Sequence, residues 1–371
     1  MAMVTAADPA PHRSALRTIW IVSEGSPGHI SQSRGLVEAI GSLVPAQSFQ
    51  VEVREKGGGG LRGLYRALFQ LTPGLRPLWI RFCASCGDLP LTPPEMIVAS
   101  GGKSVFSARF LADRYDVPLV YCGSPAPYPA AWFDCILSTG NSADKGKNWI
   151  PTDVLLNPIT PAMVNQAAAA FALPAGNSSS PAARIGTVLV GGRSRSQLFA
   201  DEDWLDLGRQ LNLLAQRDGW SWLIATSRRT GAEAEAILRA TLDPAYILDA
   251  VWWSENPRKV VRAYLGHAQA VFVGCDSMTM VSEAVCSGRP VVVFGPRESQ
   301  PSMMIDGFLA NLEKKKLLLA RTCQNLGKSA VELARLAPMS ESPIMGYAQN
   351  VLQILAGKFR PGQGFDNGGG L

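Results

Sequence analysis

Short apolar runs alternate with amphipathic segments along most of the sequence, and this alternation limits the fold more than any other feature. In the first half, the expected strands are residues 18–23, 49–54, 96–100, 118–123 and 135–139, and the expected helices are residues 31–43 and 105–115. Repeated alternation of strand and helix favours a parallel sheet with helices on both faces. Residues 17–157 are therefore expected to form a doubly wound, Rossmann-like α/β domain.

A break in the alternation follows at residues 158–183, where a short helical stretch leads into "LPAGNSSSPAA", a composition typical of linkers. The pattern then restarts within residues 184–340. The expected strands there are residues 184–190, 220–225, 268–274 and 290–294, and the expected helices are residues 204–217, 231–241 and 278–287. The sequence thus predicts two doubly wound domains in tandem. A last helix within residues 341–357 could pack back on the first domain, and residues 1–16 and 358–371 are expected to be flexible.

The composition excludes some classes of protein. Of the 371 residues, 47% are apolar and 18% are charged, which is enough apolar material for real cores and excludes global disorder. The net charge of +5 is mildly basic, which suits phosphorylated ligands or an anionic membrane surface. The basic residues fall in separate loops and not in a continuous stripe with stacking aromatic residues, so nucleic-acid binding is disfavoured.

Cysteine usage and the length of the apolar runs indicate the compartment. The seven cysteines are odd in number and mostly lie in or beside apolar runs, as in a reduced, cytoplasmic protein. Cys83 and Cys86 form a C-x-x-C pair, but no second pair follows at zinc spacing and no thioredoxin-like pattern surrounds it. The first sixteen residues lack the apolar region of a secretory signal, and no apolar run reaches the ~18–20 residues of a membrane span. We expect a cytoplasmic protein, with peripheral attachment to the inner face of the membrane as an option.

Three loops of the second domain follow expected strands and carry polar or basic residues: "GGRSRS", "TSRRTG" and "CDSM". In a parallel sheet these loops open on the same edge, where helix N-termini favour anions. Gly191 and Gly192 allow close backbone approach, and the guanidinium groups of Arg228 and Arg229 can bind phosphate bidentately. A diphosphate is the expected ligand, and the alternative is that these arginines are solvated loop residues.

Asp276, Ser277 and Glu283 stand out because a helix between two apolar strands needs only an apolar face. On the expected helix at residues 278–287, Glu283 falls on the same face as Asp276 and Ser277 and lies below them. A carboxylate in this place, beside an anion pocket, could bind a ribose diol through two hydrogen bonds. The alternative is that Glu283 is an ordinary exposed helix residue.

In the first domain, the loop "SEGSPGHISQSRGL" occupies the equivalent place. Gly28 belongs to its tight turn, His29 lies at the tip and Gln32 follows in the first helical turn. The loop is not G-x-G-x-x-G, so the dinucleotide fingerprint is absent. His29 is a candidate general base, but a structural role is equally open because the sequence locates no partner carboxylate. A second loop, "SGGKS" with Lys103, resembles the end of a Walker A motif but lacks its leading residues, so ATPase chemistry is not expected.

Five motifs, "SPGHISQSRGL", "VLVGGRSRS", "TSRRTG", "WWSENP" and "GCDSMTMVSEAVCSGRPV", together resemble the ELM-type mitochondrial-fission protein family and occur in the same order. They extend over both domains. The bacterial members of that family are taken to be nucleotide-sugar glycosyltransferases. The resemblance therefore implies a GT-B architecture, in which two Rossmann-like domains face each other across a cleft and the second domain holds the nucleotide-sugar.

Carried over to this chain, the resemblance implies two sets of site residues. The nucleotide-sugar would contact Gly191, Gly192, Ser194, Arg228, Arg229, Asp276, Ser277, Met278 and Glu283. The acceptor side would include Gly28, His29 and Gln32, with Lys103 added from its neighbouring loop. The family usually has an Asp-Gly-Lys-Pro-Gly-His run, which here begins Glu24-Gly25-Ser26, so a role for the family's lysine does not carry over.

We therefore expect a GT-B glycosyltransferase that moves a sugar from a nucleoside-diphosphate-sugar to an acceptor hydroxyl without a cofactor or metal. The Asp-x-Asp run "DED" at residues 201–203 opens an expected helix and is not in a loop suited to a divalent cation. Arg228, Arg229 and helix N-termini would instead neutralise the leaving group, and His29 would act as general base.

Residues 61–82, "LRGLYRALFQLTPGLRPLWIRF", mix arginines, aromatic residues and leucines. Such a segment could lie at a membrane interface, or it could be an amphipathic helix that packs on the core with its basic residues outside. If it contacts a membrane, the expected acceptor is lipid-linked, such as an envelope glycolipid or a lipopolysaccharide precursor.

Two other functions remain open. A nucleotide-sugar epimerase or hydrolase on the same fold would act on the donor without an acceptor. A non-catalytic membrane adaptor is suggested by the fission-linked relatives, and it should tolerate loss of Arg229 and Glu283. Both enzyme functions predict that donor binding depends on these two residues.

Overall fold

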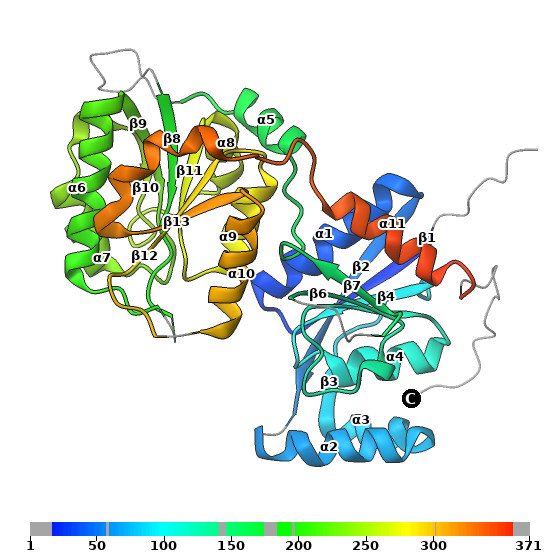
Figure 1. Ribbon diagram of the computed structural model, residues 1–371. Coiled ribbons are helices and arrows are strands. Elements are labelled where there is room, and N and C mark those ends of the chain that lie inside the picture. Colours follow the sequence, from blue (N-terminus) through cyan, green and yellow to red (C-terminus); the bar gives the residue numbers. More distant parts are fainter. Residues whose placement is uncertain are drawn as a thin grey trace, which may run out of the picture. The chain divides into compact units, whose positions relative to one another are not determined.

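The computed structural model describes residues 17–56, 59–140, 146–173, 184–194, 197–300 and 302–358. They form two α/β units, each built on a sheet that is parallel at its centre (Figure 1). The expectations for residues 1–16, for residues 174–183 of the linker and for residues 359–371 of the tail lie outside the described residues, as do Arg195 and Ser196.

The first sheet has the strand order β3-β2-β1-β4-β5-β6-β7. Its strands are β1 (Arg17–Ser23), β2 (Ala46–Glu55), β3 (Ala84–Cys86), β4 (Met96–Ser100), β5 (Leu119–Cys122), β6 (Cys135–Thr139) and β7 (Trp149–Thr152). β1 pairs in parallel with β2 and β4, and β4 with β5. β3 departs from the expected parallel arrangement, because it runs antiparallel to β2. The chain returns to the same edge of the sheet after an excursion through two helices, so no crossover to a parallel neighbour is made.

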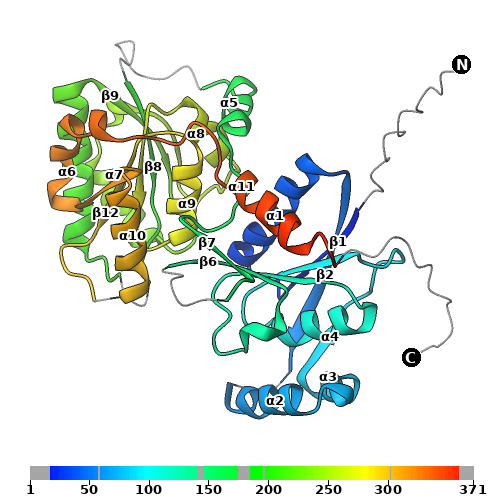
Figure 2. The same cartoon turned by 45° about the vertical axis from the view of Figure 1, so that its right-hand side comes forward.

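The helices of this unit are α1 (Pro27–Leu43), α2 (Gly59–Leu71), α3 (Arg76–Cys83), α4 (Val105–Tyr115) and the larger part of α11 (Ile344–Leu355). Right-handed crossovers place α1 and α4 on opposite faces of the sheet, as both views show (Figures 1 and 2). α1 begins four residues earlier than the expected residue 31, at Pro27, whose fixed φ angle and missing N–H suit a first helical position. This early start places His29 in the first turn of α1.

The second sheet has the order β10-β9-β8-β11-β12-β13, and all of its described pairings are parallel. Its strands are β8 (Arg184–Leu189), β9 (Trp220–Ala225), β10 (Ile247–Val251), β11 (Ala270–Gly274), β12 (Val291–Gly295) and β13 (Leu318–Thr322). α6 (Asp201–Asp218) and α7 (Ala232–Thr241) cover one face. α8 (Val261–His267), α9 (Met278–Cys286) and α10 (Met303–Lys314) cover the other (Figure 1).

The remaining described helices are short. They are α5 (Pro161–Ala169), within the expected linker, and the 3₁₀ helices η1 (Pro73–Leu75), η2 (Ala130–Trp132), η3 (Pro244–Tyr246), η4 (Cys323–Val331) and η5 (Leu333–Arg335). None of the helices within the described ranges has the length and apolar character needed to cross a bilayer.

Contacts divide the chain between Ile136 and Leu137, within β6, and again between Tyr347 and Ala348, within α11; the short stretch Arg34–Leu36 groups with the second unit. The division therefore falls inside two elements, whereas the sequence analysis placed it at residues 158–183. Lys358, just beyond α11, donates to Asp134 of the first unit, with Nζ 2.5 Å from Oδ1. The first unit is consequently built from three separate stretches of sequence, which end at Ser33, run over Val37–Ile136 and resume at Ala348.

Candidate functional site

Each sheet reverses its strand order at one place, between β1 and β4 in the first unit and between β8 and β11 in the second. Open parallel sheets bind ligands beyond the carboxyl ends of their strands at such a reversal, because the loops diverge there and leave room. Most of the residues singled out in the sequence lie in the loops that follow these four strands. Each reversal is therefore a candidate site within its own unit.

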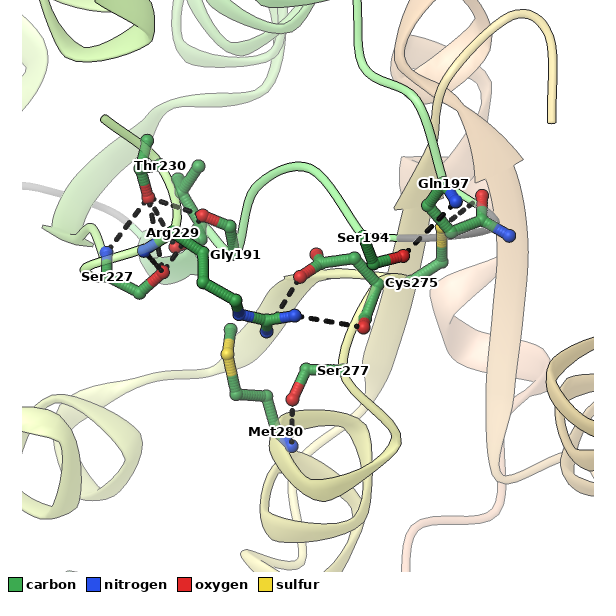
Figure 3. A network of polar contacts seen from close by, with 11 residues as sticks. Gly191, Ser194, Gln197, Ser227, Arg229, Thr230, Cys275, Ser277 and Met280 are labelled. Carbon is green, nitrogen blue, oxygen red and sulfur yellow. Dashed lines mark hydrogen bonds and ion pairs between the residues drawn. The ribbon is translucent and has the colours of Figure 1, made fainter. Parts of the chain in front are cut away.

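In the second unit, the loop after β9 is bonded to the loop after β8 (Figure 3). Ser227 Oγ donates to the carbonyl oxygen of Gly191 at 2.9 Å, and Thr230 Oγ1 donates to the carbonyl oxygens of Val190, at 3.1 Å, and Gly191. The backbone N–H of Ser227 donates in turn to Thr230 Oγ1 at 2.9 Å. The hydroxyl groups of "TSRRTG" thus fix its shape and leave its arginines at the strand edge.

Arg229 joins these two loops to the loop after β11 (Figure 3). Its Nη2 lies 2.8 Å from Asp276 Oδ2, and its Nη1 donates to the carbonyl oxygen of Asp276 at 3.4 Å. The Arg229 side chain is 40% exposed, whereas that of Asp276 is fully buried. The guanidinium group therefore has one side bound to the protein and the other open to a ligand.

Asp276 is a buried carboxylate with incomplete compensation. Burial raises the pKa of its carboxyl group above the ordinary value, and the charge of Arg229 and the nearby N–H group of Gly192 offset only part of that rise. Neither carboxylate oxygen has a hydrogen bond of good geometry among the described residues. The ion pair is the main interaction that stabilises the charged form of Asp276.

Gly191 and Gly192 are needed where these loops meet. A Cβ on Gly191 would lie within 3.0 Å of the Asp276 carboxylate, and a Cβ on Gly192 within 3.0 Å of the Arg229 backbone. The sequence predicts that this pair lets a diphosphate approach the backbone. In the structure, the space that a side chain would take is filled by the protein itself, so the glycines let three loops pack together.

The other expected donor residues surround this junction. Ser194 Oγ accepts a hydrogen bond from the N–H of Gln197 at 3.1 Å, and Ser277 Oγ accepts from the N–H of Met280 at 3.4 Å, which caps α9. Arg228 is exposed next to Arg229. Met278 and Glu283 lie in α9 itself and are half-buried.

A cavity of about 370 Å³ opens beside Arg229. It is lined by Arg193, Asp201, Trp204, Arg229, Thr230 and the first turn of α7. Two guanidinium groups and the N-terminus of α7 line this cavity, and so do the carboxylates of Asp201 and Glu233, so its charged groups are of both signs.

In the first unit, the reversal holds a His–Glu pair that the sequence analysis did not find. His29 Nδ1 lies 2.5 Å from Glu24 Oε1, and their side chains are 39% and 11% exposed. Gly101, which follows β4, has a φ of +83°, and a Cβ there would lie within 3.0 Å of both His29 Nδ1 and Glu24 Oε1. Glycine is thus required at position 101 by its backbone conformation and by the closeness of the pair. The signal in the sequence was an acid directly after a buried strand.

The pair is arranged so that Glu24 is ionised. Burial raises the pKa of its carboxyl group, but the hydrogen bond with His29, its own backbone N–H and the charges of His29 and Lys103 outweigh burial, so the pKa is lower than usual. A carboxylate accepts only, so Nδ1 donates in this contact and Nε2 is the ring nitrogen that the contact leaves available. Ser100 Oγ donates to the carbonyl oxygen of His29 at 2.6 Å and fixes the backbone there.

The remaining acceptor-side residues lie on the same two loops. Gly28 is half-buried and Gln32 buried in the first turns of α1, and Lys103 is exposed after β4. Lys103 is near enough to Glu24 for its charge to lower the pKa of that carboxyl group.

Acidic residues do not gather into a metal site in the ranges that the structure describes: no group of three or more His, Cys, Asp or Glu side chains could hold an ion. In the "DED" run, Asp203 accepts hydrogen bonds from the N–H groups of Ala200 and Arg297, both at 2.9 Å. It therefore caps the start of α6 and anchors the loop after β12.

Several solved structures share this fold at low sequence identity. The UDP complex of MnaA from S. aureus matches with a TM-score of 0.54 and 12% identity, covering 92% of this chain and 98% of that one. A UDP-GlcNAc 2-epimerase from Neisseria meningitidis bound to UDP-GlcNAc matches with a TM-score of 0.51 and 12% identity, covering 92% of this chain and 100% of that one. The glycosyltransferase of kitacinnamycin matches more weakly, with a TM-score of 0.49 and 14% identity, covering 93% of this chain and 96% of that one. The fold is GT-B.

Sequence comparison gives the family. A search of curated proteins found no match. The family model described as "Mitochondrial fission ELM1" matches residues 27–344, from the first residue of α1 to the first residue of α11. This confirms the resemblance carried by the five motifs: the chain belongs to the mitochondrial fission ELM1 family.

Proposed function

We propose that the protein is a glycosyltransferase that moves a sugar from a nucleoside-diphosphate-sugar to an acceptor hydroxyl. The observation that carries the proposal is the Arg229 guanidinium, held at the strand reversal of the second unit with one side bound to Asp276 and 40% of its side chain exposed. Arg228 lies exposed beside it. A diphosphate needs this kind of fixed, partly open cationic edge, because charge-assisted hydrogen bonds to phosphate are strong only when the donors are preorganised.

His29 is proposed as the general base. As the acceptor oxygen forms its bond to the anomeric carbon, the bond from that carbon to the diphosphate breaks, and the hydroxyl proton passes to His29 Nε2. The nucleoside diphosphate leaves with the electron pair of the broken bond. Glu24 supports this role because it holds the imidazole by Nδ1 and stabilises the imidazolium that forms.

We propose further that the reaction needs no cofactor or divalent cation, since Arg228 and Arg229 would neutralise the leaving diphosphate. Turnover measured in EDTA and in millimolar Mg²⁺ tests this directly. Equal rates are expected, and a rate that depends on the cation would contradict the proposal.

The donor site is tested by calorimetry of UDP, ADP, GDP and their sugars with the full chain, with Arg229→Ala and with Arg217→Ala. Arg217 is a matched control, because it also pairs with an aspartate, Asp218 at 2.7 Å, and its side chain is 45% exposed. Binding that selects one base and is weakened only by Arg229→Ala is the expected result. If no nucleotide binds to the unaltered chain at millimolar concentration, the protein is not a transferase, and an adaptor function is favoured.

A nucleotide-sugar epimerase or hydrolase is the second candidate. It is suggested by the likeness to the UDP-GlcNAc 2-epimerase from Neisseria meningitidis, which shares the fold with a TM-score of 0.51. The two enzyme functions differ in their need for an acceptor. NMR of the donor alone with the enzyme decides between them: a new epimer or free sugar identifies the second candidate, and an unchanged donor favours transfer.

We propose that the acceptor is lipid-linked, such as an envelope glycolipid or a lipopolysaccharide precursor, and that the enzyme works on the cytoplasmic side of the membrane. The seven cysteines are free thiols, as is usual in a reducing compartment. Support for the lipid comes from exposed apolar side chains within residues 61–82. Competition of a detergent-solubilised lipid extract with a water-soluble sugar acceptor, followed by mass spectrometry, tests which class is glycosylated.

A further inference from the structure

One stretch of the first unit exposes an unusual number of large apolar side chains. Twelve such side chains are exposed in the part of the chain that the structure describes, and six of them lie between Leu61 and Phe82. These six are Leu61, Leu64, Leu71, Leu75, Leu78 and Phe82. Single exposed leucines are ordinary on protein surfaces, but a cluster of this kind marks an interaction site.

α2 has two apolar faces, and the protein covers only one of them. Phe69 is fully buried, and its ring lies 4.9 Å from that of Phe106 in α4 and 6.0 Å from that of Trp132. Leu61, Leu64 and Leu71 recur at helical spacing on another face, and their exposed fractions are 47%, 55% and 77%. The inward face accounts for the packing of α2, so the outward leucines are not needed for it.

α3 continues the exposed surface. Ile80 and Cys83 are buried, whereas Leu78 and Phe82, one helical turn apart, are 46% and 56% exposed. Leu75, in η1 between the two helices, is 48% exposed. In both views α2 and α3 lie next to each other along one outer edge of the first unit, beside α4 (Figures 1 and 2).

The charged residues of this stretch of sequence have one sign. Residues 56–87 contain five basic residues and no acidic residue. Arg62 and Arg76 pair with Glu55 and Asp113, at 2.5 Å each. The other three are Lys56, Arg66 and Arg81, which are half-buried or exposed. Arg66 donates to the carbonyl oxygen of Pro127 at 3.0 Å, and Lys56 donates to that of Arg81 at 3.2 Å. The surface is therefore apolar and basic at once.

An anionic lipid bilayer fits this combination better than a protein does. A second copy of the chain, packed symmetrically, would bring the basic groups of both copies together, which is unfavourable. At a bilayer, leucine and phenylalanine side chains enter the acyl region, while lysine and arginine extend to the phosphates and are attracted by the negative surface.

We propose that α2, η1 and α3 form a surface that docks on anionic membranes, with the six exposed apolar side chains inserted and with Lys56, Arg66 and Arg81 at the lipid phosphates. This surface is independent of the proposed sugar transfer, because docking requires neither the donor nor His29. The enzyme would be held at a membrane without crossing it.

The test is flotation of the full chain with vesicles of phosphatidylglycerol and phosphatidylcholine in equal parts, and with vesicles of phosphatidylcholine alone. Binding to the anionic vesicles is expected, and it should be weaker by about tenfold or more on the neutral ones and in high salt. Leu64→Asp with Leu71→Asp should abolish it, and Arg66→Glu with Arg81→Glu should reduce it to the neutral-vesicle level. Leu198→Asp with Leu213→Asp is the matched control, since these leucines of the second unit are 48% and 43% exposed.

Three results would overturn the proposal. The first is absence of flotation with anionic vesicles, and the second is equal flotation of the Leu64/Leu71 variant. The third is concentration-dependent self-association of the unaltered chain, seen by analytical ultracentrifugation, that the same variant abolishes while lipid has no effect. If the aspartate pair lowers the unfolding temperature, the neutral pair Leu71→Gln with Leu78→Gln takes its place, because glutamine is a good helix former.

Discussion

The strand reversals of the two units are built alike and charged differently. In each, a glycine of one loop packs against the acid of the opposite loop: Gly101 against Glu24 in the first unit, and Gly191 against Asp276 in the second. In each, the acid pairs with a base, at 2.5 Å for His29 and 2.8 Å for Arg229. The topology therefore repeats, down to the glycine that makes room.

The two acids nevertheless have opposite pKa shifts. Burial raises the pKa of both, but hydrogen bonding with His29 outweighs burial for Glu24, whereas Asp276 is more deeply buried and lacks well-formed hydrogen bonds. The state of the acid is thus fixed by its hydrogen bonds and desolvation and not by its place in the sheet. An ionised Glu24 suits proton transfer through His29, and the Asp276–Arg229 pair suits fixed charge at a binding edge.

The largest effect is expected at His29, the proposed general base. His29→Ala should lower kcat by about 10²–10⁴-fold, the usual contribution of a general base, and should leave donor affinity unchanged. Release of the nucleoside diphosphate at saturating donor measures kcat, and calorimetry measures affinity. His267, whose Nε2 lies 3.0 Å from the carbonyl oxygen of Phe171, provides the control variant His267→Ala. Comparable losses in the two variants would remove His29 from the mechanism.

The next largest effect concerns the basic partner in the second unit. Arg229→Ala should weaken donor binding by about 10- to 100-fold, because it removes a charge-assisted contact and leaves Asp276 facing the diphosphate. Arg228→Ala should cost less, since it leaves no buried charge unpaired. Isothermal titration of the donor ranks the variants. Adding Asp276→Asn to Arg229→Ala should restore part of the affinity, and no recovery would show that Asp276 does not act on the donor.

Glu24→Gln should lower kcat by about tenfold or more, because a neutral amide no longer stabilises the imidazolium or selects the Nδ1-protonated form. Glu24→Asp keeps the charge and should retain more activity than Glu24→Gln. The pH dependence of kcat for the three proteins is the measurement. A Gln variant with an unchanged profile would reduce the pair to a structural contact.

Part of the fold and of the site could be predicted from the sequence, and part could not. Strands such as Met96–Ser100 and Trp220–Ala225 were predicted to the residue, because they are mostly apolar and buried throughout. Strand ends in a parallel sheet meet at one edge, so the loops with Arg229 and Asp276 could be grouped. The ion pair between Arg229 and Asp276 could not be predicted, because it depends on how closely the side chains approach each other across Gly191.

The elements that escaped prediction lie mainly at the sheet edges. β3, β10 and β13 are only partly buried, so they lack a continuous apolar run. The Glu24–His29 pair escaped because its geometry depends on the left-handed conformation of Gly101, more than seventy residues away. Local pattern carries no information about such a contact.

The smallest expected effect is on stability, and it distinguishes Asp276 from Glu24 by the opposite directions of their pKa shifts. For Asp276 the folded pKa lies above the ordinary value of 3.8, so its stabilising contribution is present below that pH and is lost as pH rises through the folded pKa. For Glu24 the folded pKa lies below the ordinary 4.5, so its contribution is present above that pH and is lost as pH falls.

As pH rises from 4 to 7, the unfolding temperature of Asp276→Asn should therefore increase relative to that of the unaltered chain, by about 1–3 °C. Over the same range the unfolding temperature of Glu24→Gln should decrease relative to that of the unaltered chain, by about the same amount. Differential scanning calorimetry at several pH values measures both trends. Slopes of the same sign for the two variants would contradict the opposite pKa shifts.

The division of the chain within β6 and α11 has a consequence for synthesis. The last strand of the first sheet, β7, ends at Thr152, whereas the part of α11 that groups with the first unit begins at Ala348, so residues 153–347 must emerge from the ribosome before this last stretch exists. At about 5–20 residues per second this takes roughly 10–40 s. During that interval the nascent first unit lacks the end of α11 and the partner of Asp134, so the apolar surface that Val351 and Leu355 contact in the finished protein is still open to water.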